Sequence, residues 1–147
     1  MQHNRNNYSQ DPFYSKCREF RLKVTPQRLA IYENLAKSKK HPSAEQVYKI
    51  VKRRFPNISL DTINRTLATF ARIGLINVVE NFGLPRRYDA DITGHHHAHC
   101  IKCGLIYDIY DDKLDRIKIP AEIRRRFKIT GKRVVFSGLC EKCSKRE

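Results

Sequence analysis

The residues with the clearest capacity for chemistry lie at 94–108, where the sequence reads GHHHAHCIKCGLIYD. This stretch holds four of the six histidines and two of the five cysteines, Cys100 and Cys103. A second Cys-x-x-Cys pair, Cys140 and Cys143, follows after 36 intervening residues. Thiolates and imidazoles are common protein ligands for divalent transition metals. The stretch therefore predicts metal binding, at either one mixed site or two sites with different ligands.

The two Cys-x-x-Cys pairs match the ligand set of a closed, tetrahedral zinc site. Each pair can wrap a metal from a tight turn, and Gly104 and Gly138 stand where such turns need backbone freedom. In a reducing compartment such pairs bind zinc more often than they form disulfides. The alternative is redox-active dithiols or reactive free cysteines, and Cys17 is interpreted as an ordinary thiol. The predicted ligands of a structural Zn²⁺ are Cys100, Cys103, Cys140 and Cys143.

The histidines indicate a second kind of site. His95 and His97 alternate, so on a strand both imidazoles project from one face, and two such imidazoles suit a divalent transition metal. Asp89 and Asp108 are near in sequence and would add carboxylate oxygens, which gives an N/O site suited to Fe²⁺ or Mn²⁺. The alternative is a surface histidine tract that binds nothing specific.

The first half of the chain reads as a series of helices that would position part of these ligands. Thr25 followed by Pro26 predicts a helix start, because threonine caps a helix and proline suits its first position. The stretch S-A-E-Q from Ser43 is a capping box followed by an amphipathic pattern. The predicted helices cover residues 13–22, 26–37, 43–55 and 59–74.

A two-stranded ribbon is predicted after these helices. Residues 75–80 read as a strand, 81–85 as a turn and 86–89 as the return strand. The last three of these helices followed by a ribbon are the order of a winged helix. Its third helix, here 59–74, would enter the DNA major groove while the basic ribbon contacts phosphates. The alternative is a three-helix core that binds only protein. The side chains predicted to contact DNA are Thr62, Asn64, Arg65, Thr69, Arg72, Arg86 and Arg87.

Beyond Asp89 the pattern changes to that of a small α+β unit. A unit of about 50 residues is too small to be stable without a staple or a partner subunit, which favours both a structural zinc and dimerisation. The histidine-rich run reads as one strand, and further elements are predicted at 104–110 (strand), 111–118 and 120–127 (helices) and 128–140 (a long strand). The predicted domains are 1–90, a winged-helix DNA-binding domain, and 91–147, an α/β dimerisation and metal-binding domain.

The charge supports a polyanionic partner. The net charge is +15, with +10 in residues 1–90 and +5 in residues 91–147. Such an excess predicts salt-dependent attraction to nucleic acid, although a generally basic protein would share it. No apolar run approaches the roughly 18 residues that a membrane span needs, and the N-terminus lacks the apolar region of a secretory signal. We therefore expect a cytoplasmic protein that engages no membrane and no small-molecule substrate.

The sequence resembles the ferric uptake regulator (Fur) superfamily of bacterial metal-dependent transcription regulators. The resemblance runs from about Arg21 to Cys143, nearly the whole chain. It is specific because it rests on an ordered set of motifs rather than on any one of them. These motifs are RLKVTPQRLAIYENL, KKHPSAEQVYKIV, FPNISLDTINRTLATFARIGLI, RRYD, HHHAHCIKCGLIYD and GLCEKC.

The resemblance implies an N-terminal winged-helix domain, a C-terminal dimerisation domain, structural zinc at the four cysteines, and a homodimer that represses by binding a double-stranded DNA operator. In the metal-sensing site that the resemblance implies, this chain has two aspartates, Asp89 and Asp108. In this respect it resembles the peroxide-responsive PerR branch more than iron-sensing Fur, which commonly has glutamates at these positions. In that branch Fe²⁺ reacts with hydrogen peroxide and a ligand histidine is oxidised, here His41 or His95, which releases DNA. The sensing site straddles the domains, and its ligands map onto His41, Asp89, His95, His97 and Asp108.

Some residues depart from the family pattern. The recognition helix usually reads A-T-V-Y-R-x-L, whereas this chain has D-T-I-N-R-T-L. Asn64 replaces the aromatic residue that meets thymine methyls and is able to pair with an adenine edge, and Asp61 could repel phosphate or accept from cytosine. We therefore expect a different operator. A third metal site in some members needs a C-terminal histidine that KITGKRVVFSG lacks. His96 and His99 are not assigned to a site, and stray metal binding is expected for them.

Three other functions are compatible with parts of the sequence. An iron-responsive uptake regulator would share every motif but ignore peroxide. A zinc-stapled protein-interaction module would share the cysteines but lack salt-sensitive DNA affinity. A metalloenzyme could use the histidines and an aspartate, but no residue resembles a placed general base, and the basic winged helix would have no purpose. The sequence therefore predicts a non-enzymatic regulator.

Overall fold

The computed structural model describes residues 11–79 and 83–146. The chain forms two compact units, one that ends at Ile92 and one that begins at Thr93. Three parts of the sequence discussed above lie outside the described residues: the first ten residues, the end of the predicted first ribbon strand and the start of its turn. Among the helices that the structure describes, none has the length and apolar character required to cross a membrane.

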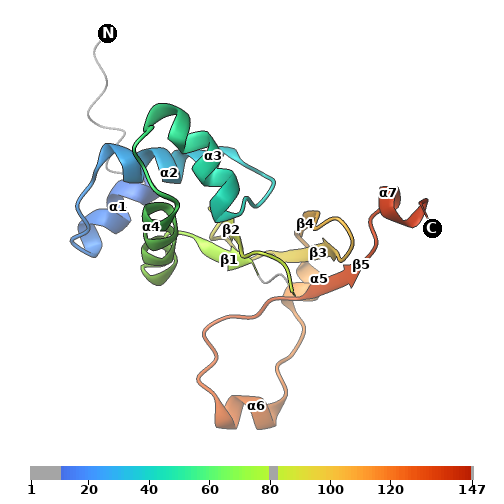
Figure 1. Ribbon diagram of the computed structural model, residues 1–147. Helices are drawn as coiled ribbons and strands as arrows, with labels where there is room; N and C mark the ends of the chain where they lie inside the picture. The colour runs from blue at the N-terminus through green and yellow to red at the C-terminus, as the bar shows by residue number, and fades with distance from the viewer. Residues whose placement is uncertain (1–10, 80–82, 147) are drawn as a thin grey trace. The chain divides into compact units, whose positions relative to one another are not determined.

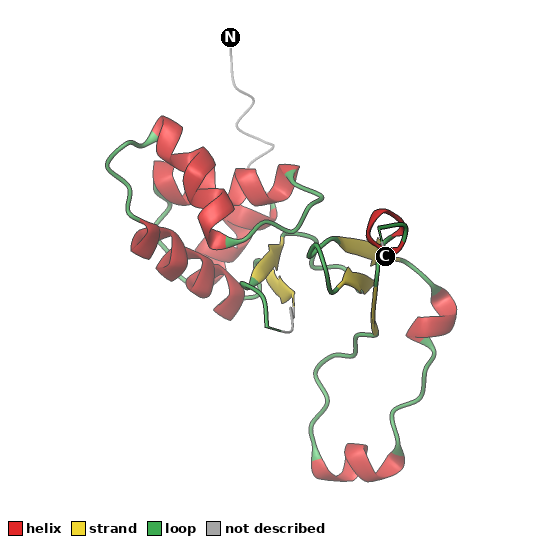
Figure 2. Cartoon of the chain, turned by 45° about the vertical axis from the view of Figure 1, so that its right-hand side comes forward, coloured by secondary structure: helices red, strands yellow, loops and turns green. Residues whose placement is uncertain are grey.

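Helices make up most of the first unit (Figure 1, Figure 2). The predicted start signals are confirmed: the Thr25 hydroxyl accepts from the Arg28 N–H at 3.2 Å, and Ser43 and Gln46 exchange the two hydrogen bonds of a capping box. Gly74, at φ +70°, takes the left-handed conformation that commonly ends a helix. The helices are α1 (Pro12–Glu19), α2 (Pro26–Lys37), α3 (Ala44–Arg54) and α4 (Leu60–Arg72).

These helices share one apolar core. The Phe13 ring stacks on Tyr32 at 5.3 Å between centroids and meets Phe70 edge-on at 6.0 Å. Ile63 and Leu67 of α4 are fully buried in the same core, and each such side chain stabilises the fold by roughly 1.5–3 kcal/mol. Because α4 is anchored through this face, its opposite face points outward.

The ribbon follows α4 and completes the order of a winged helix. Strand β1 (Asn77–Val79) pairs antiparallel with β2 (Arg87–Asp89). The first strand is shorter than predicted, because Leu75 is buried in the helical core instead of pairing. The Tyr88 N–H donates to the Pro42 carbonyl at 3.1 Å, so β2 is tied to the segment that precedes α3.

The second unit is a three-stranded sheet with short helices, in the strand order β4-β3-β5. The central strand β3 pairs antiparallel with β4 and parallel with β5. Both predicted helical pieces are present, and the second is carried on a long loop that leaves the sheet (Figure 2). The elements are β3 (His96–Cys100), β4 (Ile106–Ile109), α5 (Asp112–Asp115), α6 (Ala121–Arg126), β5 (Val135–Gly138) and α7 (Glu141–Ser144).

The long strand predicted at residues 128–140 is wrong in its extent, because only β5 is a strand. The side chain of Lys132 donates to the backbone carbonyls of Asp115 and of Ile117, the latter at 2.6 Å. These bonds hold the segment before β5 against the end of α5, and the strand itself begins only at Val135. The sequence pattern also missed α7, a single turn that carries the last cysteine.

Candidate metal centres and DNA-contacting surface

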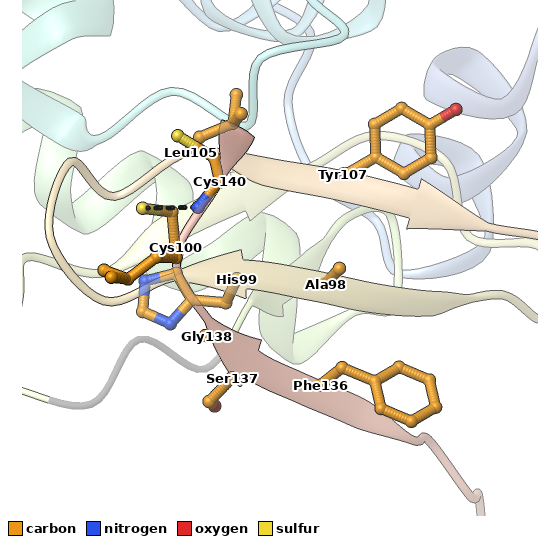
Figure 3. A pocket seen from close by; sticks show the side chains of 10 residues that line it. Ala98, His99, Cys100, Leu105, Tyr107, Phe136, Ser137, Gly138 and Cys140 are labelled. Atoms are coloured by element: carbon orange, nitrogen blue, oxygen red, sulfur yellow. Dashed lines mark hydrogen bonds between the residues drawn. The ribbon is translucent and has the colours of Figure 1, made fainter. Parts of the chain in front are cut away.

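The four cysteines of the two Cys-x-x-Cys pairs lie together in the second unit. Their sulfur atoms are all within 4.8 Å of one another, and those of Cys103 and Cys140 are 3.7 Å apart. A tetrahedral zinc with Zn–S bonds of about 2.3 Å spaces its sulfurs about 3.8 Å apart, so the cluster fits this metal. The Cys140 N–H donates to the Cys100 sulfur at 3.3 Å, which fixes the ends of β3 and β5 relative to each other (Figure 3).

The thiols of this cluster differ in acidity. Hydrogen bonds from the backbone N–H groups of Cys103 and Cys140 lower the pKa of Cys100 to about 6. The pKa of Cys143 is raised to about 12, mainly by a hydrogen bond with the Cys140 side chain and to a lesser extent by burial. The backbone therefore favours one thiolate, while a further charge on the crowded sulfurs is opposed. A divalent cation at the centre removes that opposition, which is how thiolate zinc sites assemble.

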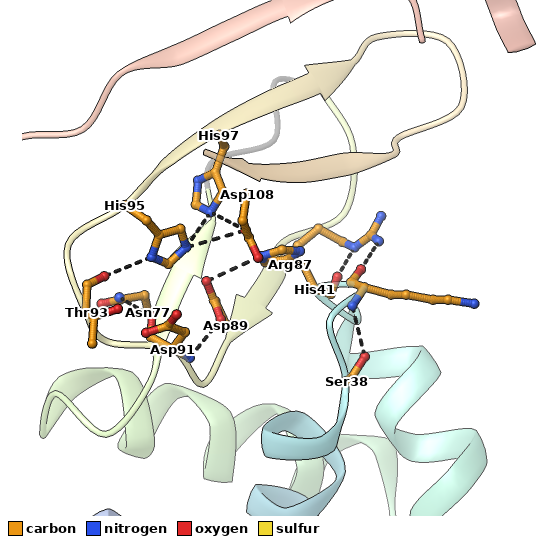
Figure 4. Close-up of polar contacts among 11 residues, drawn as sticks. Ser38, His41, Asn77, Arg87, Asp89, Asp91, Thr93, His95, His97 and Asp108 are labelled. Carbon is orange, nitrogen blue, oxygen red and sulfur yellow. Dashed lines mark hydrogen bonds and ion pairs between the residues drawn. The ribbon is translucent and has the colours of Figure 1, made fainter. Parts of the chain in front are cut away.

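His95, His97 and Asp108 form a second cluster in the same unit. The Nε2 atoms of the two histidines are 3.1 Å apart, and Asp108 Oδ1 lies 3.5 Å from His95 Nε2 and 3.3 Å from His97 Nε2. His95 is held by a 2.8 Å contact from its Nδ1 to the Thr93 carbonyl (Figure 4). The ring of Tyr110 stacks on His95. The predicted same-face arrangement is therefore observed, and β4 supplies the carboxylate.

His41 and Asp89 form the corresponding pair in the first unit. Both side chains are buried, and His41 Nε2 lies 3.3 Å from Asp89 Oδ2. The Asp91 N–H donates to the other carboxylate oxygen at 2.8 Å and so orients it. His41 has a positive φ of 48°, an uncommon conformation for a residue other than glycine.

Arg87 keeps the His41 backbone in this conformation. Its guanidinium donates to the carbonyl of His41 and, at 2.8 Å, to the carbonyl of Lys40 (Figure 4). Burial lowers the pKa of Arg87 from its ordinary value. In this structure the Arg87 side chain is directed to the loop that carries His41. The DNA contact predicted for Arg87 stays a prediction. The sequence offered no signal for this clamp, which joins residues 46 positions apart.

The two histidines without a predicted role differ from each other. His96 Nδ1 accepts from the Val134 N–H at 3.0 Å, so its Nε2 carries the proton and faces Asp115 Oδ1, also at 3.0 Å. His96 thus connects β3 to the segment before β5 and to α5, without a metal. His99 is buried, and neither ring nitrogen has a hydrogen-bond partner among residues 11–79 and 83–146. Nothing in the structure explains His99.

The outward face of α4 carries most of the residues predicted to contact DNA. Asn64, Arg65 and Arg72 are exposed, whereas Thr62 and Thr69 are half-buried. Exposed Arg86 precedes β2, and a groove of about 500 Å³ between α4 and this segment is lined by Asn64, Arg65 and Arg86 among others. Arginine and asparagine are side chains that commonly contact nucleic-acid phosphates and sugars, and the acidic Glu45 also lines the groove.

A winged helix with an exposed basic helix, in a chain that also carries a thiolate cluster and His/Asp clusters, defines the class of metal-binding transcription regulators. The model of the "Ferric uptake regulator family" matches residues 19–137. The peroxide operon regulator of Bacillus subtilis is 35% identical over 130 residues, which cover 88% of this chain and 90% of that protein.

Two solved structures are similar over most of this chain. The Campylobacter jejuni peroxide stress regulator has a TM-score of 0.69 and 30% identity, with 88% of this chain and 97% of that chain covered. The Helicobacter pylori ferric uptake regulator has a TM-score of 0.77 and 20% identity, with 98% and 97% covered, and is described as having three functional metal binding sites. The chain belongs to the ferric uptake regulator family, whose members are DNA-binding regulators and not enzymes.

Proposed function

We propose that this protein is a metal-dependent repressor that binds a double-stranded DNA operator as a homodimer and responds to peroxide. Residues 1–90 serve as its DNA-binding domain and residues 91–147 as its dimerisation and metal-binding domain. The observation that carries the proposal is the distribution of ligands. One cluster of His and Asp lies in the unit with the basic α4, and the other lies in the unit with the zinc-type cysteines.

The residues proposed to hold the regulatory ion combine both sets. Three imidazole nitrogens and two carboxylates make a donor set that suits Fe²⁺ or Mn²⁺ better than the softer thiolates do. The four cysteines are proposed to keep Zn²⁺ permanently. The proposed regulatory ligands are His41, Asp89, His95, His97 and Asp108.

A ligand set divided between two units explains how a small ion can control DNA binding. When all five side chains share one ion, the two units of a chain are restricted to fewer relative positions. In a homodimer this restriction favours the spacing of two recognition helices that matches two DNA half-sites. Metal and DNA affinities are then coupled reciprocally, so each ligand strengthens the binding of the other.

A homodimer is supported by the exposed apolar face of the second unit. Tyr107 of β4 is 68% exposed and Phe136 of β5 is 51% exposed, and together they flank a hollow of about 330 Å³ on the sheet (Figure 3). A unit of this size gains much of its stability from covering such a face.

Peroxide sensing is the finer part of the proposal. It is supported by the peroxide-regulator relatives and by the two aspartates, Asp89 and Asp108, among the proposed ligands. Bound Fe²⁺ would supply the one-electron chemistry that activates hydrogen peroxide. His41 and His95 are the side chains proposed to gain an oxygen atom, and a histidine oxidised in this way loses its value as a ligand.

The DNA-binding proposal is tested with the full-length protein in its zinc-containing form. Affinity for a duplex selected from a random pool is measured with and without Mn²⁺, at two salt concentrations. We expect Mn²⁺ to raise the affinity at least about 10-fold, the usual scale of allosteric coupling, and salt to lower it steeply. Metal-independent binding would contradict the switch, and no binding would favour a protein-interaction module.

The peroxide proposal is tested by mass spectrometry of Fe²⁺-loaded and Mn²⁺-loaded protein after treatment with hydrogen peroxide. We expect His41 or His95 to gain one oxygen atom in the Fe²⁺ form only. If no histidine of the Fe²⁺ form is oxidised, the protein is an iron-responsive regulator that ignores peroxide.

A further inference from the structure

The outward face of α4 carries an ion pair at its N-terminal end. Arg65 Nη2 lies 2.9 Å from Asp61 Oδ2, one helical turn earlier, and the two side chains are 76% and 73% exposed. Asp61 is the only acidic residue within α4, in a half of the chain that carries a net charge of +10. Asp61 therefore places a negative charge, and offsets the positive charge of Arg65, on the surface that a polyanion would meet.

The backbone beneath this pair is well fixed. The Ser59 hydroxyl accepts from the Thr62 N–H at 3.1 Å and caps the helix, and the Thr69 hydroxyl donates to the Arg65 carbonyl at 2.9 Å. Arg65 also lines the groove that Asn64 and Arg86 share. Helix stability therefore does not depend on the ion pair alone, and Arg65 is positioned to reach either Asp61 or a ligand in the groove.

The strength of the pair determines which ligand can displace it. An exposed ion pair contributes about 0–1 kcal/mol, and a contact between arginine and phosphate is likewise weakened by salt. A bidentate contact between arginine and the edge of guanine contributes about 1–3 kcal/mol of discrimination. Non-specific DNA, which offers Arg65 only phosphates, therefore gains little free energy when it displaces Asp61 from Arg65. A correctly placed guanine gains more.

We propose that Asp61 is a specificity-determining residue, which pairs with Arg65 and thereby weakens binding to non-specific DNA more than binding to the operator. Asp61 acts in two ways. Its carboxylate repels phosphates, and Arg65 leaves it only for a base edge whose hydrogen bonds are stronger than the ion pair that they replace. This inference rests on the proposed DNA-binding function. It accounts for the one acidic residue of a helix whose other charged side chains are arginines.

The test compares Asp61→Asn, Asp61→Glu and wild type as full-length, Mn²⁺-loaded proteins. Each is titrated with the duplex that wild type selects from a random pool and with a scrambled duplex of the same composition, over a range of salt concentrations. Glu122→Gln is the matched control, because Glu122 and Arg126 form an exposed pair of the same spacing at 3.0 Å on α6. Circular dichroism checks that each variant keeps its helices.

For Asp61→Asn we expect affinity for the scrambled duplex to rise about 5-fold, and affinity for the selected duplex to rise less. The ratio of the two affinities should fall at least about 3-fold, and the salt dependence for the scrambled duplex should steepen by about one counterion. Asp61→Glu and Glu122→Gln should keep the wild-type ratio.

Four results would overturn the inference. An equal change for both duplexes would mean a general charge effect. A loss of affinity in Asp61→Asn for the selected duplex alone would mean that Asp61 contacts a base directly instead of weakening non-specific binding. If wild type itself prefers no sequence, the proposed function fails together with the inference, whereas metal-dependent selective binding that Asp61→Asn leaves unchanged defeats the inference alone.

Discussion

The thiolate cluster and the His/Asp clusters use different means to bind metal in one small chain. All four cysteines belong to the second unit, and a hydrogen bond from the Cys140 N–H to the Cys100 sulfur already joins the end of β3 to the residues after β5. The His/Asp ligands are divided, with His41 and Asp89 in one unit and three ligands in the other. A metal site whose ligands all lie in one unit can only stabilise that unit. A site proposed to take ligands from both units can change the arrangement of the two units when the ion binds.

The largest expected effect comes from breaking the thiolate cluster. Cys103→Ser should abolish stoichiometric zinc and unfold the second unit, because structural zinc contributes about 10–16 kcal/mol, more than a small domain's total stability. Zinc quantification and circular dichroism measure this. Cys17→Ala is the control, since Cys17 is a buried thiol of the first unit and its loss should leave zinc at one per chain. Retention of zinc by Cys103→Ser would show that the cluster is not a four-cysteine site.

A smaller effect is expected when the His/Asp set of the second unit loses one ligand. His97→Ala should weaken Mn²⁺ binding by at least about 100-fold while zinc content stays unchanged. Loss of a residue that only supports a ligand lowers metal affinity by about 10–100-fold, and loss of a ligand itself should lower it more. Titration calorimetry of zinc-containing protein gives the affinity. His99→Ala is the matched control, a buried histidine of the same strand outside the cluster, and equal losses in both variants would mean general damage to β3.

Arg87 tests whether the first unit's ligands depend on their support. Arg87→Lys keeps the charge but loses the two-carbonyl clamp on the His41 loop, because an ammonium cannot reproduce the guanidinium's fork. We expect Mn²⁺ affinity to fall about 10-fold with zinc unchanged. Arg86→Lys, at the exposed neighbouring residue, should leave metal affinity at the wild-type value. Wild-type affinity in Arg87→Lys would remove the clamp from the account.

The smallest effect concerns the metal-free connection made by His96. Asp115→Ala removes the carboxylate that faces His96 Nε2 and should destabilise the second unit by about 1 kcal/mol, the usual contribution of a hydrogen bond. Chemical denaturation of the zinc-containing protein measures it, and metal stoichiometry should not change. Loss of a bound metal from Asp115→Ala would instead make His96 a ligand.

The sequence predicted the elements whose signals are local. Thr25 with Pro26, the Ser43 capping box and the Cys-x-x-Cys pairs each act over a few residues, and the structure has the helix starts and the sulfur cluster they predict. What the sequence did not reveal depends on partners distant in the chain. The Lys132 contacts that shorten the last strand and the Arg87 clamp join segments 15 to 47 residues apart, which no periodicity encodes.

The central claim is that one regulatory ion is shared by the two units, and His41→Ala tests it most directly. Mn²⁺ affinity and the Mn²⁺ dependence of duplex binding are measured on the same zinc-containing protein. If the ion is shared, Mn²⁺ affinity falls at least about 100-fold and duplex binding no longer responds to Mn²⁺. If His41→Ala binds Mn²⁺ as tightly as wild type, the ion belongs to the second unit alone and the proposed switch is wrong.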